Sequence, residues 1–181
     1  MNTRGMRGVT VIELMVVICI AGILSGFAYI GTEMIHKEQV SSAARELLAD
    51  IQRARMNAMT QGGKGYGIRF ESSSSYVLFE FDDCNSDYSY DPSSCGGSRE
   101  ETNVIKRQLA STVVLNKTKP LNLFNNYVLI FDQLGYPRQA NWGMGIMTIV
   151  VRSESDNSII KCITISMNRI RESSWNGAAC L

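Results

Sequence analysis

The chain has 181 residues, of which 45% are hydrophobic and 19% are charged, and its formal net charge is +1. This length suffices for one domain with a hydrophobic core and an additional helical arm. The balance of charge excludes a global electrostatic attraction to nucleic acid or to a membrane, so any such binding has to be local.

A short basic segment precedes a long apolar run at the start of the chain. Met1 to Gly8 carries two arginines and no acidic residue, as the n-region of a secretory signal does. Val9 to Ile30 follows, with Glu13 as its only charged residue. A helix over this run is about 33 Å long, which is enough to cross a bilayer core of roughly 30 Å. The sequence therefore predicts a transmembrane helix.

The basic segment also predicts the orientation of this helix. Arginines stay on the cytoplasmic side, so the rest of the chain is expected outside the cytoplasm. A carboxylate inside a membrane is costly and indicates a functional residue, unless Glu13 reaches the interface instead.

An ordinary, cleaved signal peptide is the alternative to a transmembrane helix, because Gly26-Phe27-Ala28 has the small-x-small form of a cleavage site. The position of Glu13 and the helical pattern beyond the run disfavour that alternative.

The cysteines indicate the compartment. Cys19 lies in the apolar run, and the other four are Cys84, Cys95, Cys162 and Cys180. An even set fits two disulfides in an oxidising compartment such as a periplasm. The spacing favours Cys84–Cys95 and Cys162–Cys180, and two other connectivities stay open. The chain has no C-x-x-C motif, which disfavours a zinc or thioredoxin-like site, and we expect no metal or cofactor.

Beyond Ile30 the apolar residues recur on one side of a helix that we expect from about Thr10 to about Thr60. This stripe contains Val40, Ala44, Leu47, Leu48, Ile51, Ala54 and Ala58. Arg55 is the one charged residue within it. Asp50 and Arg53 are expected on the other face, at the spacing of a weak i, i+3 pair. Gln61-Gly62-Gly63 is a helix-ending signal.

Downstream of this helix the apolar period becomes two, which is typical of strands. Strands are expected at residues 66–71, 76–81, 104–109, 113–115, 128–131, 146–151 and 159–165. Residues 72–75, 132–137 and 153–157 indicate turns. Residues 82–99 indicate a surface loop. A Cys84–Cys95 disulfide that only closes this loop is the favoured interpretation, and an exposed contact surface with Tyr88 and Tyr90 is the alternative. One helix followed by many short strands predicts an α+β fold, an antiparallel sheet packed on the helix.

The residues from Gly8 to Leu14, GVTVIEL, resemble the class III signal of type IV prepilins and type II secretion pseudopilins. The resemblance implies cleavage after Gly8 by a prepilin peptidase and N-methylation of Val9, the mature N-terminus. Phenylalanine is usual at that position, so Val9 departs from the pattern. The resemblance also implies that Glu13 pairs with the N-terminal ammonium of an adjacent subunit in a filament. A subunit out of register would bury an unpaired charge.

Three later segments are similar to GspH/FimT-type minor pilins: Arg53–Ala58, Phe131–Gly135 and Ile163–Arg171. The family commonly has a Gly-Arg-x-Arg turn in the last of these, and Asn168 replaces its glycine. Asparagine tolerates a left-handed backbone better than most residues, so we expect that turn to survive. The resemblance implies a pilin fold with a leader at 1–8, an assembly helix at 9–35 and a head domain at 36–181.

In some FimT-like members the C-terminal arginine turn binds DNA. Carried over, this implies that Arg169 and Arg171 contact phosphates, with Lys161 and Arg152 as neighbours. Nearby acidic residues dilute this patch, and two arginines on a solvated strand end are the alternative. Trp175 can stack on a base or pack beneath a Cys162–Cys180 disulfide.

The resulting expectation is a minor type IV pilin that primes pilus assembly or lies at the tip. The alternatives are a minor pseudopilin of type II secretion and a DNA-binding pilin of natural transformation. Expected partners are other pilins, the prepilin peptidase, an inner-membrane assembly platform and, in the last case, DNA. The expected location is the bacterial inner membrane with the head in the periplasm, then a pilus or pseudopilus. An enzyme is disfavoured, because no catalytic set, phosphate loop or metal spacing is found in the sequence.

Overall fold

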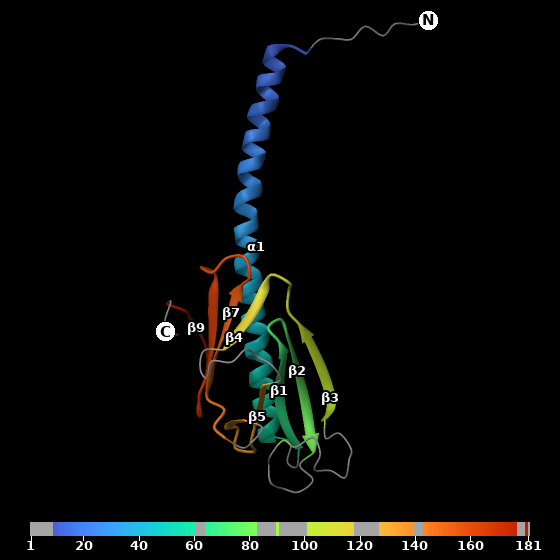
Figure 1. Ribbon diagram of the computed structural model, residues 1–181, viewed down its shortest axis with the longest axis vertical. Helices are drawn as coiled ribbons and strands as arrows, with labels where there is room; N and C mark the ends of the chain where they lie inside the picture. The colour runs from blue at the N-terminus through green and yellow to red at the C-terminus, as the bar shows by residue number, and fades with distance from the viewer. Residues whose placement is uncertain are drawn as a thin grey trace, which may run out of the picture. The chain divides into compact units, whose positions relative to one another are not determined.

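The computed structural model describes residues 9–60, 64–82, 90, 101–117, 127–139, 143–176 and 180, with the backbone alone for 27–32, 82 and 117 (Figure 1). The chain divides into two units, Met1–His36 and Lys37–Leu181. Helix α1 (Val11–Thr60) contributes residues to both units, and its bounds agree with the helix predicted from about Thr10 to about Thr60. The expected helix-ending residues 61–63 lie outside the described part of the chain.

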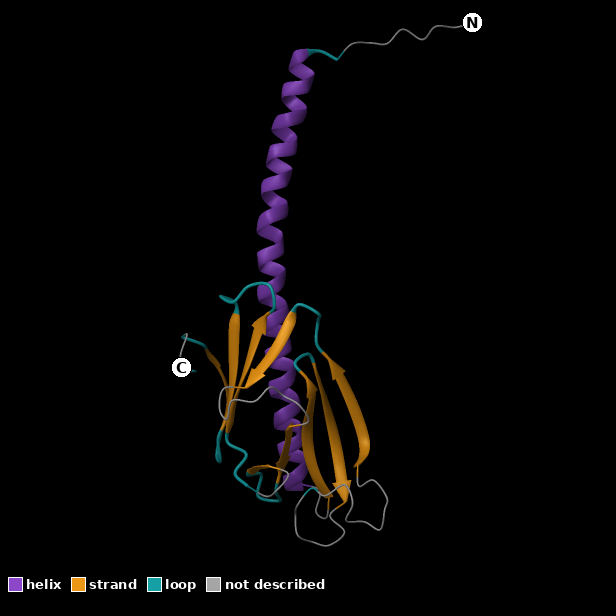
Figure 2. Cartoon of the chain, in the orientation of Figure 1, coloured by secondary structure: helices purple, strands orange, loops and turns teal. Residues whose placement is uncertain are grey.

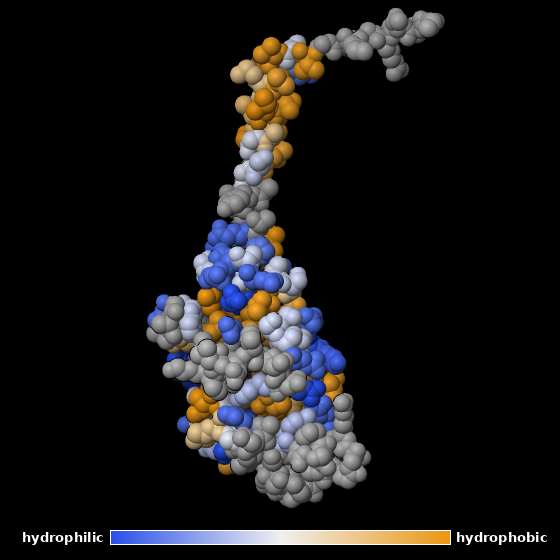
Figure 3. All heavy atoms as spheres, in the orientation of Figure 1, coloured by the Kyte–Doolittle hydropathy of each residue, from blue (hydrophilic) through white to orange (hydrophobic). Residues whose placement is uncertain are grey.

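In the first unit, α1 begins behind a threonine cap. The Thr10 hydroxyl accepts a hydrogen bond from the backbone N–H of Glu13 at 3.3 Å, which satisfies a donor left free at a helix start. The next apolar side chains, including the consecutive residues Leu14 to Ile18, are each more than half exposed (Figure 3). In the described residues, no helix has an apolar stretch long enough to cross a membrane. The predicted membrane segment ends at Ile30, and the side chains of 27–30 are not described.

The second unit consists of the C-terminal half of α1 and two antiparallel sheets (Figure 2). The strands are β1 (Lys64–Ser72), β2 (Ser75–Asp82), β3 (Glu101–Gln108), β4 (Val113–Lys117), β5 (Tyr127–Phe131), β6 (Pro137–Gln139), β7 (Met147–Ser153), β8 (Ile160–Ile165) and β9 (Ile170–Ser174). One sheet has the order β3-β2-β1-β5-β6 and the other has the order β4-β7-β8-β9. The chain is therefore α+β, as predicted, with two sheets where one was expected.

The sequence did not predict strands β6 and β9. Strand β6 has three residues and begins with Pro137, so it is too short to show an alternating pattern. Strand β9 has the sequence IRESS, with Ile170 as its only apolar residue, and it lies at the edge of its sheet. An edge strand with little buried surface gives no period-two signal, and only pairing with β8 defines it.

The core of the second unit lies between the apolar stripe of α1 and the inner faces of both sheets. Ala44, Leu47 and Ile51 on the helix are fully buried, as are Ile68 on β1 and Ile149 on β7. Burial of each leucine or isoleucine side chain stabilises the fold by roughly 1.5–3 kcal/mol. The stripe predicted from helical spacing is therefore the element that holds both sheets.

Asp50 lies on the buried side of α1, and the prediction of a solvent-facing pair with Arg53 is wrong. Its side chain is 5% exposed. The Tyr76 hydroxyl donates a hydrogen bond to Asp50 Oδ2 at 3.0 Å, and Arg107 Nε donates to the same oxygen at 3.2 Å. Position 50 follows the buried Leu47 by three residues, so helix geometry turns it toward the sheets. Strands β2 and β3 supply the partners that make its burial tolerable.

A second apolar cluster covers the outer face of the five-stranded sheet and consists of Phe79, Phe81, Val128 and Ile130, with Tyr90 packed against it. The Tyr90 ring centroid lies 5.0 Å from that of Phe79 and 5.6 Å from that of Phe81. The Tyr90 hydroxyl donates to Glu101. The expectation that Tyr90 is an exposed contact residue is therefore corrected, because the ring covers this cluster. Tyr88 lies outside the described residues.

Candidate functional site

The N-terminal residues implied by the prepilin resemblance fall in the first unit. Gly8 lies outside the described residues, and Val9 is 71% exposed. Glu13 is exposed in the first turn of α1. Within the described residues its carboxylate has no ion-pair partner. A carboxylate in this turn interacts favourably with the helix dipole.

Of the two predicted disulfides, the structure describes one. Cys162 and Cys180 are bonded, with their Cα atoms 6.2 Å apart and a sequence separation of 18. Cys162 is fully buried on β8. The backbone of Trp175 pairs with that of Cys180, so this tryptophan lies beside the disulfide. Cys84 and Cys95 lie outside the described residues, and Cys19 is free and exposed.

Arg169 and Arg171, the predicted phosphate contacts, are both exposed beside the turn between β8 and β9. The Ser166 hydroxyl closes this turn by donating to the Arg169 carbonyl at 2.8 Å and accepting from the Arg169 N–H at 3.2 Å. The expected left-handed conformation at Asn168 is wrong. Among the described non-glycine residues, only Asn103 has a positive φ, of 49°. The hydrogen bonds of Ser166 therefore close the turn without a left-handed residue at position 168.

The cations expected to surround these arginines are engaged elsewhere. Lys161 Nζ lies 3.2 Å from Glu172 Oε1, and Arg152 donates to Asn157 Oδ1 at 2.6 Å. Arg169 and Arg171 have no side-chain partner in the part of the chain that the structure describes. This leaves two free guanidinium groups, a small positive patch for a polyanion.

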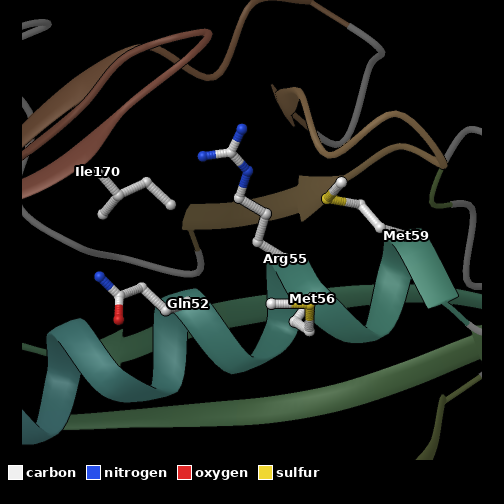
Figure 4. Close-up of a pocket in the computed structure, with 5 residues that line it drawn as sticks. All are labelled: Gln52, Arg55, Met56, Met59 and Ile170. Carbon is white, nitrogen blue, oxygen red and sulfur yellow. The ribbon is translucent and has the colours of Figure 1, made fainter.

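The structure also has a groove that sequence reasoning did not assign. It is lined by Gln52, Arg55, Met56, Met59 and Ile170 and has a volume of about 310 Å³ (Figure 4). The guanidinium of Arg55 lies between Ile170 and Met59 in this view. The signal in the sequence was Arg55 itself, the one charged residue within the apolar stripe of the helix.

A hydrogen-bonded turn between β5 and β6 lies beside this groove. Asp132 Oδ1 accepts the backbone N–H groups of Leu134 at 3.0 Å and Tyr136 at 2.8 Å. Arg138 Nε donates to Asp132 Oδ2 at 3.1 Å. Gly135 in the turn has a φ of 76°, and a Cβ there would lie 2.6 Å from Met59 Sδ and 3.1 Å from Arg55 Nε. Glycine is therefore required by both backbone conformation and close approach. The predicted turn at 132–137 is confirmed.

Several titratable groups with shifted pKa values lie in two polar networks of the second unit, one around Asp50 and one around Glu101. Burial raises the pKa of Tyr76, and the charge of Asp50 and the hydrogen bond to it raise it further. The charge of Asp50 and the hydrogen bond to it raise the pKa of Arg107. Burial and the hydrogen bond to Glu101 raise the pKa of Tyr90 to about 12. These groups link strands to the helix and to each other, which is a structural role.

Within the described residues there is no group of three or more histidine, cysteine, aspartate or glutamate side chains that could hold a metal ion. In comparisons with known proteins, no protein family, no curated protein and no solved structure matches this chain.

Proposed function

We propose that this chain is a minor type IV pilin, a filament subunit that primes pilus assembly or lies at the tip. The observation that carries the proposal is the contrast along α1. Its C-terminal half is buried against two sheets, whereas its N-terminal half has apolar side chains that are more than half exposed. Exposed apolar surface of this extent needs a lipid or protein partner. The membrane supplies a lipid partner before assembly, and the filament core supplies a protein partner after assembly.

In this proposal Glu13 fixes the register of the subunit. After cleavage at Gly8, the ammonium group of Val9 on an adjacent subunit pairs with the Glu13 carboxylate in the apolar filament core. The exposure of Glu13 in the first turn of α1 supports this role. An unpaired charge in such a core is strongly penalised, so only the correct register is stable. Val9 to Ile30 anchors the subunit in the inner membrane, and an assembly platform moves it into the filament.

The test of this function is the recovery of the protein in filaments from its source organism. Glu13→Ala should be lost from sheared filaments while the protein accumulates in the membrane with a folded head. Glu38→Ala is the matched control, because it removes another exposed glutamate from the same helix and should assemble normally. Normal assembly of the Glu13→Ala variant would argue against the proposal. Gene deletion, scored separately for pili and for secreted proteins, distinguishes a pilin from a type II secretion pseudopilin.

DNA binding in natural transformation is a second candidate, favoured by the two exposed guanidinium groups of Arg169 and Arg171. Retardation of duplex DNA, measured at several salt concentrations, tests it. If both arginines contact phosphates, replacing them by alanine should weaken binding and reduce the salt slope by about 2. Lys106→Ala on β3 is the control, since this residue is an exposed cation elsewhere on the head. Equal slopes for the arginine variant and the parent would exclude this site.

A further inference from the structure

We propose that the groove beside Arg55 is a docking site for a partner polypeptide that presents an acidic side chain next to an apolar one. The groove is lined by the last turns of α1 and by Ile170 at the start of β9, and Gly135 of the β5–β6 turn lies beside Met59 and Arg55. The three segments that resemble minor pilins in the sequence therefore meet at this point. No property implied by that resemblance assigns a role to the groove, and the inference does not depend on the proposed function.

The charge of Arg55 indicates the acidic half of the ligand. Arg55 Nε is buried and has no hydrogen-bond partner in the described residues. Its Nη1 donates to the Asn168 carbonyl at 3.4 Å, which is long for a hydrogen bond. No described carboxylate forms an ion pair with this guanidinium. A guanidinium has five donors in a planar fork that matches a carboxylate, so most of its donor capacity is available to a ligand.

The walls of the groove indicate the apolar half. Met56 is 61% exposed and Met59 is 52% exposed, and Ile170 lies opposite them. Leu134 is 71% exposed at the tip of the turn whose Gly135 lies against Met59. Methionine side chains adapt to different apolar partners. Flexible apolar walls around one fixed cation favour a carboxylate attached to an apolar body.

Size and surrounding charge favour a polypeptide over a cofactor. At about 310 Å³, the groove is at the lower end of small-ligand pockets, which span roughly 300–1,000 Å³, and it has room for one or two side chains. The lining residues include no acid. Arg169 directly follows Asn168, so a second exposed cation is next to the groove in the chain. This charge complements an acidic segment and opposes a basic one.

The experiment follows the methionine methyl signals of the full chain, held in a mild detergent and labelled with ¹³C at the methionine methyl groups. Met56→Leu and Met59→Leu assign the two groove signals. The probe is the acetylated and amidated peptide Leu-Glu-Leu-Leu, and the same peptide with glutamine in place of glutamate is its control. The signals of Met56 and Met59 should shift saturably with the acidic peptide, and the glutamine peptide should bind at least about tenfold more weakly. The signal of Met147, which is buried in the core, should not move.

Variants test whether Arg55 carries the preference. Arg55→Gln should bind both peptides with equal weak affinity, whereas Arg53→Gln, an exposed neighbour on the same helix, should keep the preference. Met59→Glu places a carboxylate of the chain itself beside Arg55 and should abolish binding. An unchanged Met147 signal shows in each case that the head is folded.

Four outcomes would overturn the proposal. They are the absence of a saturable shift, equal binding of the acidic and glutamine peptides, hexanoate binding as tightly as the acidic peptide, and displacement of the peptide by a DNA oligonucleotide. The third would identify the groove as a site for small organic acids, and the fourth would identify it as part of a nucleic-acid surface. None of them bears on the assembly of the Glu13→Ala variant, so this proposal and the filament proposal fail separately.

Discussion

Tyr76 donates its hydroxyl hydrogen to Asp50 at 3.0 Å, and this bond joins strand β2 to the helix that holds both sheets. Both side chains are buried, and Arg107 on β3 donates to the same carboxylate oxygen. A buried carboxylate with two donors restricts how the helix can slide along the sheet, because any shift would leave a charge unpaired.

Asp50→Ala should therefore destabilise the head. The change leaves the buried Tyr76 hydroxyl without its acceptor, which costs about 1–3 kcal/mol in the free energy of unfolding. Glu46→Ala is the matched control, because Glu46 lies 3.6 Å from the same Arg107 but is half exposed. Its loss should cost less than about 1 kcal/mol. Denaturant unfolding of both variants measures the difference, and equal losses would contradict a special role for Asp50.

Stability at alkaline pH should depend on Tyr90. Its pKa is raised to about 12 by burial and by the hydrogen bond to Glu101, whereas an unfolded tyrosine has a pKa of about 10. The contribution of the neutral Tyr90 is thus fully present below about pH 10 and is lost as the pH rises toward about 12. Unfolding free energies measured across this range should fall less steeply for Tyr90→Phe than for the parent chain. Parallel curves would show that Tyr90 does not titrate in this way.

The Cys162–Cys180 disulfide should stabilise the C-terminal edge of the head. It closes a chain segment with a sequence separation of 18, for which loop-closure entropy predicts about 3 kcal/mol. Cys180→Ala removes the bond and leaves Cys162 as a small buried side chain. The variant should unfold at correspondingly lower denaturant concentration, and a reducing agent should lower the stability of the parent by about 3 kcal/mol more than that of the variant. An equal effect of the reductant on both chains would contradict a stabilising role for this disulfide.

Gly135→Ala should destabilise the turn beside the groove. The φ of 76° costs an alanine roughly 1–2 kcal/mol, and its Cβ would also displace the Met59 side chain. Gln133→Ala in the same turn is the control, since Gln133 is exposed and its loss should change the unfolding free energy by less than about 0.5 kcal/mol. If alanine at both positions behaves alike, the close approach of Gly135 to Met59 does not hold in solution.

The helix and the strands whose apolar residues repeat with a clear period could be predicted from the sequence. The stripe from Val40 to Ala58 predicted the packed half of α1, and alternation predicted the strands that form the core. The burial of a polar residue could not be predicted where its hydrogen-bond partners are distant in the sequence. Asp50 was placed on the solvent side because its partners, Tyr76 and Arg107, are 26 and 57 residues away. Such a pairing exists only after the sheet has formed.

The candidate sites likewise include one feature that the sequence predicts and others that depend on the folded structure. The Cys162–Cys180 pairing followed from spacing and is confirmed. The groove could not be predicted from spacing, because it combines residues of α1 with Ile170 of the unpredicted strand β9. Only Arg55, a charge within the apolar stripe, indicated that this part of the helix differs from the rest. The turn before Arg169 was expected to need a left-handed residue, and hydrogen bonds from Ser166 close it instead.

The central claim is that the chain is processed as a pilin, and the mass of the mature N-terminus tests it most directly. Protein purified from membranes of the source organism, digested and analysed by mass spectrometry, should begin at Val9 and carry one added methyl group. A strain without the prepilin peptidase should retain Met1 to Gly8. A mature chain that begins near Tyr29, as cleavage at Gly26-Phe27-Ala28 would produce, would contradict the account.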